Sequence, residues 1–241
     1  MRIALCLHGL FDSLTDSSSK GLDGYHHIKK NILNNHNVDI YLHSWNSDKN
    51  DEIINLYKPI DFIFEDQVDF TEKINGRNIN FLRNSPRPPK NVLSHFYSIN
   101  KVFNLLYSST KKYDIVIKSR FDLGRINRDT SGPGKLNPYP VQCINFNQNI
   151  ISNKLYMANW QHFHMGPPDM WFYGDYNTME NFTTIFEDLD NQFYLNSDFH
   201  KFAISIEGNE GDLSNSIAFL KWWMIYKKIW DNKILLDTFW E

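Results

Sequence analysis

The sequence predicts an α/β fold, in which a mostly parallel β-sheet is flanked by helices and followed by a smaller C-terminal region. Residues 2–7, RIALCL, form a continuous apolar run that is typical of a buried strand. Apolar residues recur at helical spacing over residues 21–35, and residues 38–45, VDIYLHSW, predict a second strand. A strand, a helix and a strand of these lengths indicate a βαβ unit, and therefore parallel strands.

The chain continues with two more predicted strands and a long helix between them. Residues 60–66, IDFIFED, predict the third strand. The prolines of residues 85–90, SPRPPK, are incompatible with a helix interior or a central strand, so the helix is expected to start near Asn91. Residues 113–125, YDIVIKSRFDLGR, predict the fourth strand, whose unbroken apolar start indicates a central position buried on both faces.

The second part of the chain differs from the first in its pattern of predicted elements. Residues 129–140, DTSGPGKLNPYP, form a loop by their glycine and proline content. We expect one domain over residues 1–241, with an N-terminal half at 1–128 and a C-terminal half at 129–241. The predicted elements of the second half are strands at 141–147 and 154–165, a strand or turn at 167–175, a helix at 176–189, an ambiguous segment at 197–206, and a last helix that opens near Asp212 or Ser214.

Composition excludes several classes of protein. The 241 residues are 41% hydrophobic and 22% charged, as is ordinary for a globular chain. The net charge of −3 and the absence of a basic stripe argue against a nucleic-acid partner. No apolar run is long enough to span a membrane, and the N-terminus does not resemble a signal peptide, so a cytoplasmic location is expected, in the host cytoplasm if the source is viral.

The two cysteines, Cys6 and Cys143, are not arranged as a zinc or redox motif. Cys6 lies within an apolar strand and is expected to be a small buried thiol. The sequence also lacks the glycine-rich signatures of P-loop and dinucleotide-binding proteins.

Polar residues gather where the four predicted strands end. In an open α/β sheet, ligands bind beyond the carboxyl ends of the strands, so residues at these ends are candidates even without a motif. The four ends carry His8 and Gly9; His43, Ser44 and Trp45; Glu65 and Asp66; and Lys118, Arg120 and Asp122.

Of the four strand ends, the end of the fourth strand points most clearly to a ligand-binding site. If the chain stays extended there, Arg120 and Asp122 point the same way. The pair suits a diphosphate, because a carboxylate can hold a bridging divalent metal and a guanidinium can bind phosphate oxygens directly. Spacing alone equally allows a salt bridge that merely closes the strand.

The segment YDIVIKSRFDL resembles the strand that carries the acidic metal motif in GT-A glycosyltransferases. The resemblance is strongest to viral and bacterial enzymes that build surface glycans. Five other segments match in the same order: RIALCLHG, VDIYLHSW, HFYSINKVFNLL, DMWFYGDYNTME and NEGDLSNSIAFL. The usual motif is Asp-x-Asp, and here Arg120 replaces the first acid. The second acid, the principal metal ligand of the family pattern, is Asp122, while Arg120 could supply part of the metal's charge.

The resemblance implies a GT-A-like, Rossmann-like fold with a nucleotide-sugar-binding half at 1–128 and an acceptor-side half at 129–241. It also assigns residues to the donor, a UDP- or GDP-sugar. His8 and Gly9 would border the nucleotide, with Gly9 allowing close approach of the backbone. Trp45 and Asp66 would lie near the base or ribose.

Four further residues complete the implied donor site. Tyr97 and Lys101, on the predicted long helix, would reach the nucleotide or its phosphates, although the sequence itself favours helix surface or core for both. Arg120 and Asp122 would hold the diphosphate, with Asp122 as ligand of Mn²⁺ or Mg²⁺.

The acceptor side is implied to include Asp169 and Trp171, whose ring would stack on a sugar. Glu210 and Asp212 are candidates for the catalytic base, since a carboxylate can take the proton from an attacking hydroxyl. Asp212 could instead be a helix N-cap; Asp169 is kept as a third catalytic candidate.

The expected activity is that of a hexosyltransferase-like enzyme that moves a sugar from a nucleoside diphosphate donor to a hydroxyl of a glycan acceptor, with help from a divalent metal. Two alternatives stay open. One is a non-catalytic glycan- or nucleotide-binding module derived from such an enzyme. The other is a nucleotidyltransferase, which normally needs two or more acids close together.

Overall fold

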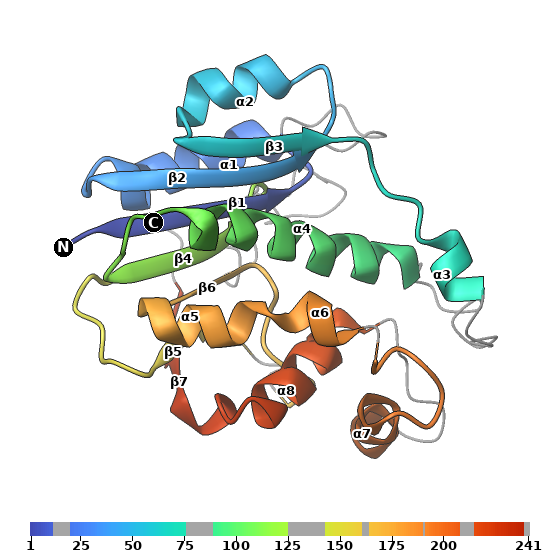
Figure 1. The fold of residues 1–241 in the computed structure, drawn as a ribbon. Helices are drawn as coiled ribbons and strands as arrows, with labels where there is room; N and C mark the ends of the chain where they lie inside the picture. Colours follow the sequence, from blue (N-terminus) through green and yellow to red (C-terminus); the bar gives the residue numbers. More distant parts are fainter. Residues whose placement is uncertain are drawn as a thin grey trace, which may run out of the picture.

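The computed structural model describes residues 1–11, 20–75, 89–124, 143–160, 164–189, 191–207 and 215–238. Within these ranges the chain forms one 7-stranded sheet with the order β3-β2-β1-β4-β6-β5-β7 (Figure 1). The strands are β1 (Ile3–Gly9), β2 (Val38–Trp45), β3 (Asp61–Glu65), β4 (Ile115–Arg120), β5 (Leu155–Ala158), β6 (Trp171–Gly174) and β7 (Lys233–Leu236).

The helices flank this sheet. They are α1 (Lys20–Ile28), which continues as a π-helical turn at Lys29–Leu33, α2 (Asn50–Tyr57), α3 (Thr71–Asn75), α4 (Pro89–Ser108), α5 (Tyr176–Thr183), α6 (Ile185–Leu189), α7 (Asp198–Glu207) and α8 (Ser216–Tyr226). No helix in the described ranges is long and apolar enough to cross a membrane.

The sheet is mixed but mostly parallel, which confirms the predicted fold class. Strands β1 to β4 run parallel to one another, β6 is antiparallel to both β4 and β5, and β7 is parallel to β5. The chain builds outward from β1 through β2 to β3, and then returns to place β4 on the other side of β1. The order of the strands therefore reverses between β1 and β4, which makes this the topological switch point of the sheet.

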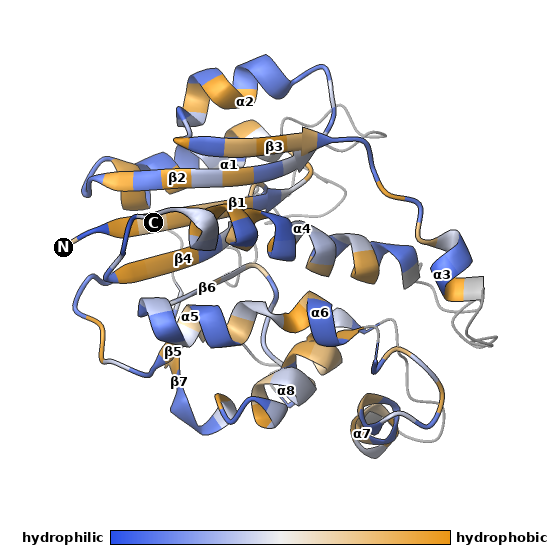
Figure 2. Cartoon of the chain, viewed as in Figure 1, coloured by the Kyte–Doolittle hydropathy of each residue, from blue (hydrophilic) through white to orange (hydrophobic). Residues whose placement is uncertain are grey.

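Two apolar layers cover the sheet, one on each face. On one face, Ala4 and Cys6 pack with α4, α5 and α6. On the other face, Leu5 and Leu7 pack with residues of α1 and α2. Because both faces are covered, the first half of β4 is hydrophobic, as Figure 2 shows. Cys6 and Cys143 are free, buried thiols, as expected for Cys6.

The second half departs from the prediction in several places. Residues 143–150 form no strand, and the ambiguous segment at 197–206 is helix α7. The helix expected over 176–189 is broken at Thr184, next to Thr183, whose hydroxyl donates back to the Met179 carbonyl at 2.8 Å. Strand β7 and the short helices α2 and α3 were not predicted.

The last helix, α8, begins at Ser216, and the side chain of Asn215 caps it by accepting from the backbone N–H groups of Ile217 and Ala218. Asn215 therefore fills the N-cap position that had been considered for Asp212. Asp212 and Glu210 lie outside the described residues.

Candidate active site

The carboxyl ends of β1, β2, β3 and β4 meet at one edge of the sheet, as predicted. His8 is aligned with His43 on one side and with Arg120 on the other, and Trp45 is aligned with Glu65. Because aligned residues of neighbouring strands face the same way, His8, His43 and Arg120 lie on the face that α4 covers. The candidate site is therefore bounded by the ends of four strands and the first half of α4.

Strand β4 ends at Arg120, and residues 121–124 form a turn. The prediction of an extended strand through residue 125 is therefore wrong. The turn nevertheless brings Asp122 back onto Arg120: the guanidinium Nε and Nη2 atoms each donate to one oxygen of Asp122, both at 2.8 Å. The salt bridge that closes the strand end, one of the two readings left open by spacing, is present.

Helix α1 holds this turn through two glycines. A Cβ atom on Gly24 would collide with the carbonyl oxygen of Phe121, so only glycine permits this approach. Gly124 has φ +74°, a conformation that favours glycine, and packs against His27 of α1. The orientation of Asp122 thus depends on close backbone packing between α1 and the turn.

Asp169, just before β6, completes a buried charge cluster with Lys118 and Arg120. Nη1 of Arg120 donates to Oδ1 of Asp169 at 3.4 Å, and Nζ of Lys118 donates to the Asp169 backbone carbonyl. Burial would raise the pKa of Asp169, but Arg120, His95 and Lys118 lower it to about 2. Burial lowers the pKa of Lys118 to about 7, although Asp169 opposes this. Asp122 raises the pKa of Arg120, whose guanidinium stays charged.

His8 and His95 lie beside this cluster, with their ring centroids 5.1 Å apart. Burial lowers the pKa of His8 well below its ordinary value and that of His95 to about 3, so both rings are neutral near pH 7. Neither nitrogen of His8 has a hydrogen-bond partner among the described residues. Nε2 of His95 is 3.7 Å from Oδ2 of Asp169, which is too long for a hydrogen bond.

A second network runs from β1 to β3 through α4. The Gly9 N–H donates to Oγ of Ser98 at 3.0 Å, and Oγ of Ser98 is 2.6 Å from Nδ1 of His43. Nε2 of His43 is 2.9 Å from Oε1 of Glu65. Burial lowers the pKa of His43 despite Glu65, so the ring is neutral near pH 7. Since a carboxylate only accepts, Nε2 carries the proton and Nδ1 accepts from the Ser98 hydroxyl.

Aromatic rings line the β2 side of this network. Trp45 stacks on Tyr97 with centroids 5.6 Å apart and an interplanar angle of 10°. Nζ of Lys101 lies 5.0 Å above the Tyr97 ring and 3.7 Å from Oε2 of Glu65. Asp66 is exposed and accepts from the Asn46 side chain at 2.8 Å. The proposed nucleotide roles of these residues remain predictions.

The structure therefore sorts the predicted residues into neighbouring groups. His8, Arg120, Asp122 and Asp169 belong to the charge cluster. Gly9, Trp45, Tyr97 and Lys101 belong to the second network, and Asp66 lies at its outer end. Trp171 is an exception.

The Trp171 side chain is fully buried and stacks on Tyr173 at 5.9 Å. The expectation that its ring faces an acceptor is wrong, because β6 is an interior strand and Trp171 faces the core layer of α1.

Five members of the site had been given no role: His43, Glu65 and Lys118 had been named only as candidates at strand ends, and His95 and Ser98 had not been named. A signal existed for each. His43, Glu65 and Lys118 occupy strand ends, while His95 and Ser98 lie three residues apart on α4, the spacing that puts two side chains on one helix face.

A divalent metal does not fit the described arrangement. Both oxygens of Asp122 already accept from Arg120, and Asp169 binds the same guanidinium. A cation on Asp122 would lie next to that guanidinium, a like-charge contact that opposes binding. In the described ranges there is also no group of three or more His, Cys, Asp or Glu residues that could hold a metal.

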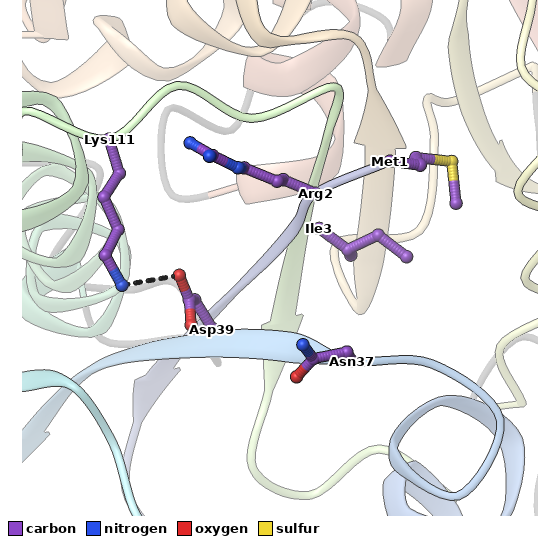
Figure 3. A pocket seen from close by; sticks show the side chains of 6 residues that line it. All are labelled: Met1, Arg2, Ile3, Asn37, Asp39 and Lys111. Atoms are coloured by element: carbon purple, nitrogen blue, oxygen red, sulfur yellow. Dashed lines mark hydrogen bonds and ion pairs between the residues drawn. The ribbon is translucent and has the colours of Figure 1, made fainter.

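A hollow of about 310 Å³ lies at the opposite, amino-terminal edge of the sheet, lined by Met1, Arg2, Ile3, Asn37, Asp39 and Lys111 (Figure 3). Nζ of Lys111 is 2.9 Å from Asp39 there, so these two charged groups of its lining are already paired. This edge is remote from the strand ends at which α/β sheets bind ligands.

No protein-family model matches the chain, and no curated protein is significantly similar to it. Among solved structures, the apo form of mouse xyloside xylosyltransferase 1 is similar, with a TM-score of 0.44 and 11% sequence identity over 98% of this chain and 85% of that one. A likeness at this level carries no conclusion about function.

Proposed function

We propose that the chain is a GT-A-like glycosyltransferase, which transfers a sugar from a nucleoside diphosphate donor to a hydroxyl of a glycan acceptor. The observation that carries this proposal is the placement of Gly9 and Arg120 side by side at the switch point between β1 and β4. Gly9 ends β1 there with φ +104°, and no atom of the described residues lies within 4 Å of the position that a Cβ would occupy, so a ligand can approach the backbone closely. Arg120 ends β4 directly beside it and supplies the cation that a diphosphate requires.

The aromatic end of the second network supports a nucleotide rather than an isolated phosphate. Trp45 and Tyr97 form a rigid stack held by His43, Glu65 and Lys101. The rim of such a stack suits a base or ribose, which offers both an apolar face and polar edges. Asp66, exposed at the end of this network, is proposed to contact the ribose.

In the proposed reaction the acceptor oxygen forms a bond to the anomeric carbon while the bond from that carbon to the diphosphate breaks. The hydroxyl proton passes to a carboxylate base, for which Glu210 and Asp212 remain the candidates. Asp169 is less suited to this role, because a carboxylate with a pKa of about 2 is a weak base near pH 7. We assign it instead to the positioning of Arg120 and Lys118.

A second candidate function is a non-catalytic nucleotide- or glycan-binding module. The observation that favours it is the closed ion pair between Arg120 and Asp122, which leaves no acidic residue of the motif free. Such a module would bind a nucleotide without turning it over.

The test is a thermal-shift screen of nucleoside diphosphates and nucleotide sugars, followed by an assay of donor hydrolysis and of transfer to glycan acceptors. A transferase gives stabilisation by one base and slow release of the free sugar. Stabilisation without turnover would support the binding module, and release of pyrophosphate from a nucleoside triphosphate would support a nucleotidyltransferase.

A further inference from the structure

We infer that the diphosphate of the donor is held directly by the guanidinium of Arg120, with Lys118, His8 and His95 behind it, and that no divalent metal bridges the diphosphate to Asp122. This inference rests on the proposed function and assigns the chemistry of its central step, the neutralisation of the leaving group. Three independent observations support it.

The first observation is the donor set at Asp122. Each oxygen of this carboxylate already accepts a hydrogen bond from Arg120 at 2.8 Å. A metal on the remaining lone pairs would lie next to the guanidinium, and this like-charge contact opposes its binding. The geometry is the bidentate pairing of a guanidinium with a carboxylate, which is the strongest form of this contact. Asp122 therefore acts as a positioning residue that orients Arg120.

The second observation concerns the hydrogen-bond donors of Arg120 that Asp122 and Asp169 do not use. A guanidinium has five N–H donors. Asp122 takes two of them and Asp169 takes one, so the other two have no acceptor within the described part of the chain. The Arg120 side chain is 32% exposed, whereas the side chain of Asp122 is 17% exposed. The guanidinium can thus bind phosphate oxygens without leaving either carboxylate.

The third observation is the set of unsatisfied polar atoms around Arg120. Both ring nitrogens of His8 and Nε2 of His95 are buried without a hydrogen-bond partner among the described residues. His8 is 1% exposed and is aligned with Arg120 across β1 and β4. Buried polar groups are normally satisfied, so an unpaired imidazole beside a cation indicates a position for a ligand atom. A neutral imidazole N–H can donate to a phosphate oxygen.

Lys118 adds a second cation to the same cluster. Its side chain is fully buried and reaches the Asp169 carbonyl. Burial lowers the pKa of Lys118 to about 7, so near neutral pH the side chain takes up or releases its proton easily. An arriving diphosphate would favour the protonated form, and Lys118 would then add its charge to that of Arg120.

The experiment is isothermal titration calorimetry of the full chain with UDP, GDP and inorganic pyrophosphate, in EDTA and in Mn²⁺. For the unaltered protein we expect the dissociation constant of the bound nucleotide to agree within about twofold between the two conditions. An affinity that rises tenfold or more with Mn²⁺, or is lost in EDTA, overturns the inference but leaves the transferase proposal intact.

The variants Arg120→Lys and Arg120→Asp sharpen this test. Replacing a forked guanidinium by lysine should weaken binding in EDTA about tenfold or more. Arg120→Asp restores an acid-x-acid motif and should make the residual binding depend on Mn²⁺. The matched control is Arg2→Lys at the opposite edge of the sheet, which should leave both dissociation constants unchanged. An Arg120→Lys variant that folds and binds like the control overturns the inference.

The remaining outcomes separate the two proposals. Binding of pyrophosphate in EDTA, without binding of any nucleotide, supports the metal-free anion site and removes the transferase. A protein that binds none of these probes in either condition overturns both. The comparison of EDTA with Mn²⁺ needs no substitution, so it holds even if a variant fails to fold.

Discussion

The two edges of the parallel sheet carry similar charged residues, but these residues differ in how deeply they are buried. At the amino-terminal edge, Lys111 and Tyr113 both donate to Asp39, and the Lys111 side chain is 46% exposed. At the carboxyl edge, Lys118 is fully buried and its pKa is lowered to about 7. The comparison shows that burial, rather than residue type, is what shifts the pKa of a charged residue at the carboxyl edge. Four predictions test this comparison.

The largest effect is expected from removing the cation that two partly buried carboxylates share. Arg120→Met leaves Asp122 and Asp169 without their guanidinium, and the free energy of unfolding should fall by about 3 kcal/mol. Urea denaturation at neutral pH measures this. A loss below about 1 kcal/mol is the size expected of a surface ion pair. It would show that the ion pairs at the carboxyl edge contribute no more to the free energy of unfolding than the pair at the amino-terminal edge.

A comparable effect on activity is expected at Asp122. Asp122→Ala frees Arg120 to move away from the diphosphate, so transfer should fall by about a hundredfold, since small misplacements of a binding group have effects of this size. The rate of donor turnover measures this, and Asp39→Ala is the matched control at the other edge. Full activity of Asp122→Ala would remove this residue from the mechanism.

A more gradual effect, spread over several pH units, is expected from acid. The ordinary pKa of histidine is 6.5, and burial lowers that of His95 to about 3 in the folded state. Below pH 6.5 the unfolded chain therefore binds a proton that the folded chain does not. The contribution of His95 to the free energy of unfolding should be fully present above this pH. It should decrease by up to about 1.4 kcal/mol per pH unit as the pH falls toward 3.

His95→Gln should flatten this dependence, as urea denaturation at several pH values would show. Asp39 cannot account for a loss in the same range, because its pKa is lowered from an ordinary value of 3.8 and its contribution disappears only in stronger acid. An unchanged slope in His95→Gln would exclude His95 as the source.

The smallest effect is expected at the amino-terminal edge. Lys111→Met removes an exposed partner of Asp39, which keeps its hydrogen bond from Tyr113. The free energy of unfolding should change by less than about 1 kcal/mol, and donor turnover should not change. A large loss of activity in Lys111→Met would contradict the assignment of function to the carboxyl edge alone.

The parallel half of the sheet was predictable because β1, β2 and β4 are largely buried on both faces, and because each strand of this half contains a short apolar run. The convergence of His8, Trp45 and Arg120 followed from the rule that parallel strands end at one edge. The second half was harder to predict. Its short strands and helices, such as β7 and α7, take their conformation from packing against their neighbours rather than from a strong pattern of their own.

The sequence alone determined which charged residues lie at the end of the fourth strand: Arg120 comes first and Asp122 two residues later. Only the tertiary structure decided that the strand stops at Arg120, that the turn folds Asp122 onto the guanidinium, and that His95 and Ser98 of α4 join the site. The physical reason is that these contacts depend on the close approach of α1 to the turn and of α4 to the sheet. Packing between elements distant in sequence sets both distances, and no local pattern encodes them.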